Sequence, residues 1–98
     1  MKKGYWVVAY RSVSDPEALA RYGSLAMKAI AAGGGRTIIR TADAIEPRES
    51  GLKQRTVVTE FESFERAVQT YHSAAYEAAR KVLGSAADRD FRIVEGAE

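Results

Sequence analysis

The chain has no cysteine, a single histidine and no long apolar run. The lack of cysteine excludes disulfides, thiol catalysis and thiolate metal ligands. One imidazole cannot supply the several nitrogen ligands of a tight zinc site, so we expect no metal and no cofactor. A membrane helix needs roughly 20 consecutive apolar residues, and the N-terminal segment does not follow the pattern of a signal peptide. We therefore expect a cytoplasmic protein without a membrane partner.

The charges are nearly balanced, with 15 basic and 13 acidic residues spread along the chain. Nucleic-acid binding by counterion release needs a basic arm or stripe, which this pattern lacks, so we expect no nucleic-acid partner. Hydrophobic residues make up 46% of the chain, which is enough for one core. A chain of 98 residues is too short for a second core. We predict a single domain over residues 1–98.

The first half of the chain predicts a strand, a helix and a second strand. Residues 5–10 combine aromatic and β-branched side chains, and both faces of this strand are apolar. Ser14 and Asp15 are alternative caps of a helix that ends near Ala32, where three glycines form a turn. Alternation over residues 36–41 places Arg36, Ile38 and Arg40 on one face and two threonines with Ile39 on the other, as in a strand near a sheet edge where charged side chains reach water.

The second half predicts a strand, an interrupted helix and a final strand. A loop or ragged hairpin over residues 42–51 precedes a strand over residues 53–61. Ser63 can cap the helix that follows, and a kink or break is expected at His72–Ser73. A short strand over residues 91–94 follows a polar connection.

The element order β-α-β-β-α-β favours an α+β fold, the ferredoxin-like sandwich. In this fold a four-stranded antiparallel sheet carries both helices on one face. The other face would stay uncovered, although the first strand is apolar on both sides. We expect a second copy to cover it, which makes the protein a homodimer. Two sheets closed on each other would form a dimeric α/β barrel.

The sequence also resembles a known family in its residues and spacings. They include Gly4-Tyr5-Trp6, Asp15-Pro16, Gly34-Gly35-Arg36, Ser63-Phe64-Glu65 and Ile93-Val94-Glu95-Gly96. On this basis the chain resembles domain-of-unknown-function family 1330, over nearly its whole length. The resemblance implies a dimeric α/β-barrel fold and no established reaction.

Glu60 is the first candidate site residue, because it lies in an apolar strand on the face opposite Phe61. A buried carboxylate needs a partner, which Arg40 or Arg55 could supply as a substrate-binding or charge-pairing residue. Glu60 is then either a substrate anchor or general base, or half of a structural ion pair at the dimer seam. The sequence leaves both alternatives open.

The second candidate group lies around the helix break. His72 is the only side chain that ordinarily exchanges protons near neutral pH, and it could otherwise be an exposed residue at a helix end. Tyr76 and Arg80 are four residues apart on one helix face and could bind a carboxylate or enolate. Tyr76 could equally be a core tyrosine with a hydrogen-bonded hydroxyl.

These residues favour a small organic ligand in a barrel pocket, with Glu60, His72 and Tyr76 as catalytic candidates and Arg40, Arg55 and Arg80 as binding candidates. By analogy of fold, the chemistry would be cofactor-independent proton transfer or oxygenation. The alternative is a non-catalytic ligand-binding or protein-interaction module. A third hypothesis is haem binding through one axial histidine.

Overall fold

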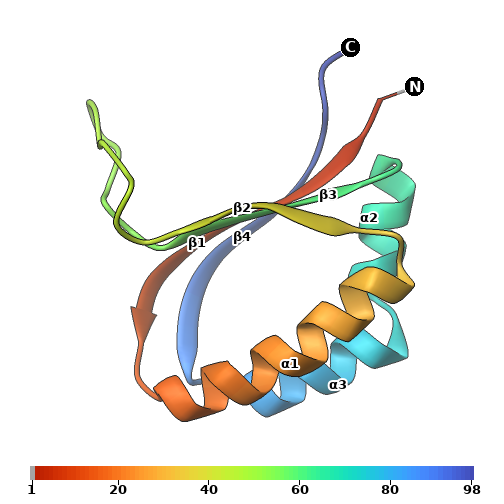
Figure 1. The fold of residues 1–98 in the computed structure, drawn as a ribbon, viewed down its shortest axis with the longest axis horizontal. Helices are drawn as coiled ribbons and strands as arrows, with labels where there is room; N and C mark the ends of the chain where they lie inside the picture. The colour runs from red at the N-terminus through yellow and green to blue at the C-terminus, as the bar shows by residue number, and fades with distance from the viewer. Residues whose placement is uncertain (1) are drawn as a thin grey trace.

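The computed structural model describes residues 2–98, which form four strands and three helices (Figure 1). Their order is β1 (Gly4–Val13), α1 (Pro16–Ala32), β2 (Arg36–Thr41), β3 (Thr56–Phe61), α2 (Phe64–Tyr71), α3 (Ala74–Leu83) and β4 (Ala87–Glu95).

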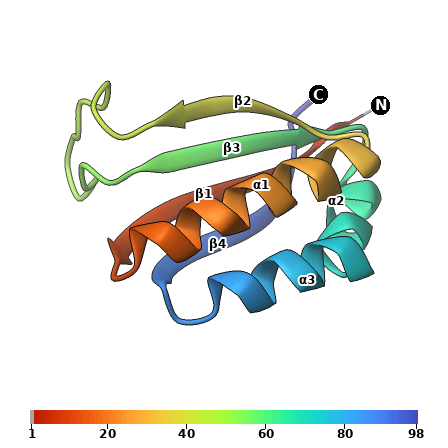
Figure 2. The same cartoon turned by 60° about the horizontal axis from the view of Figure 1, so that its bottom comes forward.

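The strands form one antiparallel sheet in the order β2-β3-β1-β4. All three helices lie on the same side of this sheet, with α1 and α3 side by side (Figures 1 and 2). The α+β ferredoxin-like fold expected from the element order is therefore confirmed, with β2 at a sheet edge. None of the helices within residues 2–98 combines the length and the apolar character that crossing a membrane requires.

Strands β1 and β4 are both longer than the sequence pattern predicts. β1 continues to Val13, and its pairing with β4 shifts at a bulge between Tyr10 and Ser12 before ending at Val13 opposite Ala87. The polar connection expected before residue 91 is therefore wrong from Ala87 onward, where β4 begins. Polar residues enter β4 because the extended β1 offers them backbone partners.

Strand β3 is shorter than the predicted 53–61. It begins at Thr56, which pairs with Thr41 at the end of β2, so residues 53–55 have no partner in β2. These residues belong instead to the long connection between β2 and β3. On the β1 side, one hydrogen bond lies just beyond the end of the β1–β3 pairing: the Tyr10 backbone N–H donates to the Arg55 carbonyl at 2.9 Å.

Each helix begins at a side-chain cap. The Asp15 carboxylate accepts from the backbone N–H groups of Glu17 and Ala18, which decides between the two predicted caps of α1. The Ser63 hydroxyl caps α2, and the Ser73 hydroxyl accepts from the Tyr76 N–H at the start of α3. The predicted break at His72–Ser73 is confirmed.

The core lies between the sheet and the helices, and it is rich in aromatic rings. Trp6 is 2% exposed and donates its indole N–H to the Ala67 carbonyl at 2.9 Å. Its ring centroid lies 4.6 Å from that of Tyr76 and 4.9 Å from that of Phe61. We call the side of the sheet that faces the helices the covered face. Besides Trp6 and Phe61 it carries Val8, Tyr10, Arg89 and Phe91.

The other side of the sheet, the open face, carries no helix (Figure 1). Register places Tyr5, Val7 and Ala9 of β1 on it, beside Val58 of β3 and Val94 of β4. Most of these side chains are half-buried by their neighbours alone. Within one chain the sheet stays open, so residues 2–98 alone form no closed barrel.

Candidate functional site

A cavity of about 330 Å³ lies between α1 and the covered face of the sheet. Helix α1 reaches it because Tyr22, Ala26 and Ile30 recur at helical spacing toward the sheet. Apolar side chains form most of the wall: Trp6, Val8, Leu19, Ala26, Met27, Ile30, Val57 and Phe91. The pocket is thus beneath the helix of one chain, whereas the sequence predicted it inside a two-chain barrel.

Three arginines line the cavity, and its lining contains no aspartate or glutamate. Arg40 lies opposite Val57 in the ladder, and Arg55 comes two residues before Val57, so both belong to the β2–β3 side of the cavity. Arg89 enters from β4. The cavity therefore carries positive charge that no carboxylate of its lining neutralises.

Aromatic rings, rather than carboxylates, hold two of these guanidinium groups. The Cζ atom of Arg55 lies 5.5 Å from the Tyr10 ring centroid, and that of Arg89 lies 5.7 Å from the same centroid. Such contacts orient a cation and leave its N–H donors free. The Arg55 Nε is buried and has no hydrogen-bond partner within residues 2–98. A buried donor without a partner is costly, so an anionic ligand would stabilise it.

A hydrogen-bonded tyrosine pair lies beside the arginines. The Arg89 guanidinium donates to the Tyr22 hydroxyl at 2.9 Å, and the Tyr22 and Tyr76 hydroxyl oxygens are 2.5 Å apart. Burial raises the pKa of both tyrosines, and the neighbouring Tyr76 hydroxyl adds to the effect on Tyr22. Both hydroxyls therefore keep their protons at neutral pH. Tyr22 lines the cavity, while Tyr76 is fully buried behind it.

Glu60 lies on the open face, as its alternation with Phe61 predicts. Its partner is Arg36, with an N–O distance of 3.3 Å, and not Arg40 or Arg55. The prediction of that partner was wrong, because Arg40 and Arg55 point to the covered face whereas Arg36 lies directly opposite Glu60 in the ladder. The Tyr5 hydroxyl also donates to Glu60 at 3.1 Å, and this hydrogen bond raises the pKa of Tyr5.

His72 and Arg80 lie outside the cavity. His72 is an exposed residue at the C-terminal end of α2, in edge contact with the Tyr71 ring. The Arg80 guanidinium lies 4.5 Å from the Tyr71 ring centroid and borders a separate surface hollow. Of the six predicted site residues, the fold brings Arg40 and Arg55 together in the cavity with Tyr76 behind it, and it leaves Glu60, His72 and Arg80 outside the cavity. The Arg80 guanidinium still lies 5.9 Å from the Tyr76 ring centroid, as the spacing of the two residues on one helix predicts.

Sequence reasoning missed Tyr10, Tyr22 and Arg89. Arg89 precedes the predicted strand over residues 91–94, but it alternates with Phe91 and so shares a face with it once β4 is extended. Tyr22 lies on the buried side of α1. A tyrosine on the sheet-facing side of α1 and an arginine on the helix-covered side of β4 each indicate a polar group in the interior, although neither local pattern indicates that the two meet.

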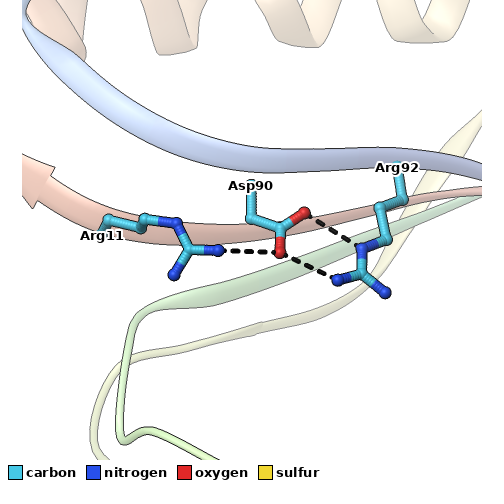
Figure 3. Close-up of polar contacts among 3 residues, drawn as sticks. All are labelled: Arg11, Asp90 and Arg92. Atoms are coloured by element: carbon cyan, nitrogen blue, oxygen red, sulfur yellow. Dashed lines mark hydrogen bonds and ion pairs between the residues drawn. The ribbon is translucent and has the colours of Figure 1, made fainter.

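A second set of arginines, on the open face, is fully paired. Asp90 accepts from the Arg11 guanidinium at 3.2 Å and from two nitrogens of Arg92, each at 3.1 Å (Figure 3). The hydrogen bonds from Arg92 lower the pKa of Asp90. Figure 3 shows the three side chains extending from β1 and β4 away from the helices. No group of three metal-ligating side chains gathers anywhere in residues 2–98.

Comparison with protein families gives one match. The model described as "Domain of unknown function (DUF1330)" matches residues 3–97. None of the curated proteins compared with the chain matches it.

Solved structures with the same fold cover nearly the whole chain. A protein of unknown function from Rhodopseudomonas palustris has a TM-score of 0.69 at 17% identity, over 99% of this chain and 84% of its own. A dimeric ferredoxin-like protein of unknown function from Thermobifida fusca has a TM-score of 0.63 at 13% identity, over 99% and 92%. A candidate antibiotic biosynthesis monooxygenase from Nitrosomonas europaea has a TM-score of 0.56 at 13% identity, over 98% and 92%. At these identities the likeness shows the fold alone.

Proposed function

We propose that this chain, which belongs to the DUF1330 family of domains of unknown function, binds a small organic acid in the cavity beneath α1. One observation carries the proposal. The cavity is walled mainly by apolar side chains, yet it contains three arginines and no carboxylate to pair with them. An acid with an apolar body matches both properties, because its body fills the apolar space and its carboxylate accepts from the guanidinium groups.

The size of the cavity supports a small ligand. Binding pockets for small molecules commonly hold about 300–1,000 Å³, and this cavity of about 330 Å³ lies at the lower end. The exposed Arg40 lies in the same lining as the buried Tyr22. The charged end of the ligand would therefore face Arg40 and Arg55, with the apolar end toward α1.

Non-catalytic binding has support from what lines the cavity. Neither an imidazole nor a carboxylate borders it, so it offers no ordinary general base for proton transfer. Glu60, the predicted base, is on the other face of the sheet. Proton transfer in this cavity would therefore have to proceed without Glu60 and His72, the two predicted bases.

Oxygenation is a second candidate function, since the fold is shared with a candidate monooxygenase. Arginines and a tyrosine hydroxyl in an apolar cavity would stabilise an enolate or phenolate, which is the electron-rich form of such a substrate. Oxygen consumption by the protein in the presence of a bound acid would support this candidate. Binding without oxygen consumption would leave the binding function alone.

The homodimer is also part of the proposal. Nothing in residues 2–98 covers the apolar centre of the open face, and a second copy would bury it sheet against sheet. A protein of the same fold is described as dimeric, which agrees with this arrangement. The cavity lies on the opposite side of the sheet, so each copy would hold its own ligand.

A thermal-shift screen tests the binding function. Aromatic and aliphatic carboxylates of about 8 to 14 heavy atoms are each compared with the neutral amide of the same acid. A ligand at 100 times its Kd stabilises the folded state by about 2.7 kcal/mol, which raises Tm by roughly 10 °C in a domain of this size. We expect acids, and not their amides, to raise Tm. If no acid does so, or if the amides do so equally, the proposal fails.

A further inference from the structure

We propose that the Tyr22 hydroxyl is a hydrogen-bond donor that recognises a second oxygen of the ligand, so that the cavity prefers oxo acids over the same acids without the oxo group. This inference rests on the proposed binding of organic acids and names the class of acid. It follows from the arrangement of protons around one oxygen atom.

The Tyr22 oxygen already receives one proton. Arg89 is a donor without acceptor capacity, so the 2.9 Å contact must run from its N–H to the Tyr22 oxygen. The other neighbour is the Tyr76 hydroxyl at 2.5 Å, where either oxygen could donate. The direction of this second hydrogen bond decides where the Tyr22 proton points.

The positions of the two residues favour one direction, because Tyr22 lines the cavity and Tyr76 does not. Tyr76 is fully buried, and within residues 2–98 its hydroxyl has no hydrogen-bond acceptor other than the Tyr22 oxygen. If Tyr22 donated, the Tyr76 proton would be buried without an acceptor, which is costly. If Tyr76 donates, its proton is satisfied, and the Tyr22 oxygen accepts from two donors, which its two lone pairs allow.

The remaining proton of Tyr22 then has no acceptor in the described part of the chain. Tyr22 lines the cavity, so a ligand there can supply that acceptor. Two donors on the same oxygen polarise the O–H bond, which strengthens the hydrogen bond it donates. Burial raises the pKa of Tyr22, so the proton is retained at neutral pH.

This arrangement selects the chemistry of the ligand. A keto, enolate or phenolate oxygen accepts from the Tyr22 hydroxyl, whereas a methylene group at the same place leaves the proton unpaired. The carboxylate binds Arg40 and Arg55 at the β2–β3 side, and the second oxygen lies toward α1. A site built to hydrogen-bond one oxygen discriminates strongly against the analogue without it.

Matched pairs of acids test the inference in the wild-type protein. Phenylpyruvate is compared with 3-phenylpropanoate, and 4-oxo-4-phenylbutanoate with 4-phenylbutanoate, by titration calorimetry. We expect the oxo acid of at least one pair to bind about 5- to 10-fold more tightly, which corresponds to about 1–1.4 kcal/mol for one hydrogen bond. Equal affinity within both pairs overturns the inference and leaves the binding function intact. No binding of any of the four acids overturns both.

Two single-hydroxyl variants then assign the preference to Tyr22. Tyr22→Phe is expected to remove the oxo preference. Tyr76→Phe is expected to keep it, because the Tyr22 proton does not depend on Tyr76 as an acceptor. If Tyr76→Phe instead creates a preference that the wild type lacks, Tyr22 donates to Tyr76 and the inference is wrong. Tyr5→Phe, on the open face, is the matched control and should bind the acids like the wild type. If Tyr22→Phe does not fold, the ratio of the wild-type affinities for oxo acid and analogue, together with Tyr76→Phe, still decides.

Discussion

Arginines on the two faces of the sheet have different partners. On the open face, Arg36 pairs with Glu60, and Arg11 and Arg92 share Asp90. On the covered face, two of the three cavity arginines lie against aromatic rings, and the lining has no carboxylate: Arg55 on Tyr10, and Arg89 on Tyr10, Tyr22 and Phe91. The same residue type is thus neutralised where the sheet meets solvent and left unpaired where it is enclosed.

This difference separates structural arginines from binding ones. An exposed ion pair contributes little to stability, and its loss is tolerated. An enclosed guanidinium without a counter-charge costs free energy, and only an anion that enters the cavity offsets this cost. The predictions that follow test whether the two faces differ in this way, beginning with the largest expected effect.

The covered face should contain the core on which stability depends. Trp6→Ala removes a 2%-exposed ring that packs on several aromatic neighbours, and we expect a loss of about 3–5 kcal/mol in the free energy of unfolding. Urea unfolding at several protein concentrations measures it. Leu52→Ala, at a position 63% exposed, is the control and should change stability little. A small effect of Trp6→Ala would show that the helices do not seal this face.

The open face should contribute through assembly. Val58→Asp places a charge at the centre of the apolar strip, and we expect it to raise the dimer dissociation constant at least about 100-fold, or about 2.7 kcal/mol. Sedimentation velocity distinguishes the 10.7 kDa chain from a species of twice that mass. Val82→Asp, on the exposed side of α3, is the matched control. A wild-type protein that stays monomeric at micromolar concentration would contradict the homodimer.

Ligand binding should distinguish the arginines of the two faces directly. Arg55→Met keeps an unbranched apolar stem and removes the guanidinium with its charge, and we expect it to weaken the binding of an organic acid about 10- to 100-fold, the value of a hydrogen bond to a charged group. Arg11→Met removes an arginine that is already paired with Asp90, so acid binding should be unchanged. Titration calorimetry with one acid measures both variants. Equal losses would show that net charge, and not the cavity, attracts the acid.

The sequence was sufficient to predict the helices, the strands and their arrangement in layers, because these follow from local patterns. Alternation, caps and the triple glycine predicted β2 and both ends of α1, and Ser73 predicted the start of α3. The boundaries of β1, β3 and β4 were less accurate, because a strand extends only as far as its neighbour offers partners. That information is not local.

The site was harder to predict for the same reason. Arg40 and Arg55 were identified as binding residues, but the sequence paired them with Glu60, which lies on the other face. A shift of one residue changes the face on which a strand residue lies, and the bulge between Thr37 and Ile39 produces such a shift in β2. The contact between Tyr22 and Arg89 joins residues 67 positions apart, so no local pattern could indicate it.

The tyrosine pair predicts sensitivity of the covered face to alkali. The folded state raises the pKa of Tyr22 and Tyr76 above the value near 10 that both have when unfolded. Their contribution is therefore complete below pH 10 and is lost as pH rises, by up to about 1.4 kcal/mol per pH unit for each tyrosine. Urea unfolding between pH 9 and 11.5 measures the slope. The double variant Tyr22→Phe/Tyr76→Phe should flatten it, and an unchanged slope would show that other groups are responsible.

Asp90 predicts the opposite sensitivity on the open face, with the smallest effect because its ion pairs are solvated. The folded state lowers the pKa of Asp90 below its ordinary 3.8 through the hydrogen bonds from Arg92. Its contribution is therefore complete above that value and is lost as pH falls through the lowered one. Asp90→Asn should be slightly less stable than the wild type at pH 7, and this difference should shrink as pH falls below 3.8 and the carboxylate becomes protonated. Asp43→Asn, in the exposed β2–β3 connection, is the control. If the difference in stability persists in acid, Asp90 stabilises the protein by packing and not by its charge. The carboxylate would then not be what holds Arg11 and Arg92 in place.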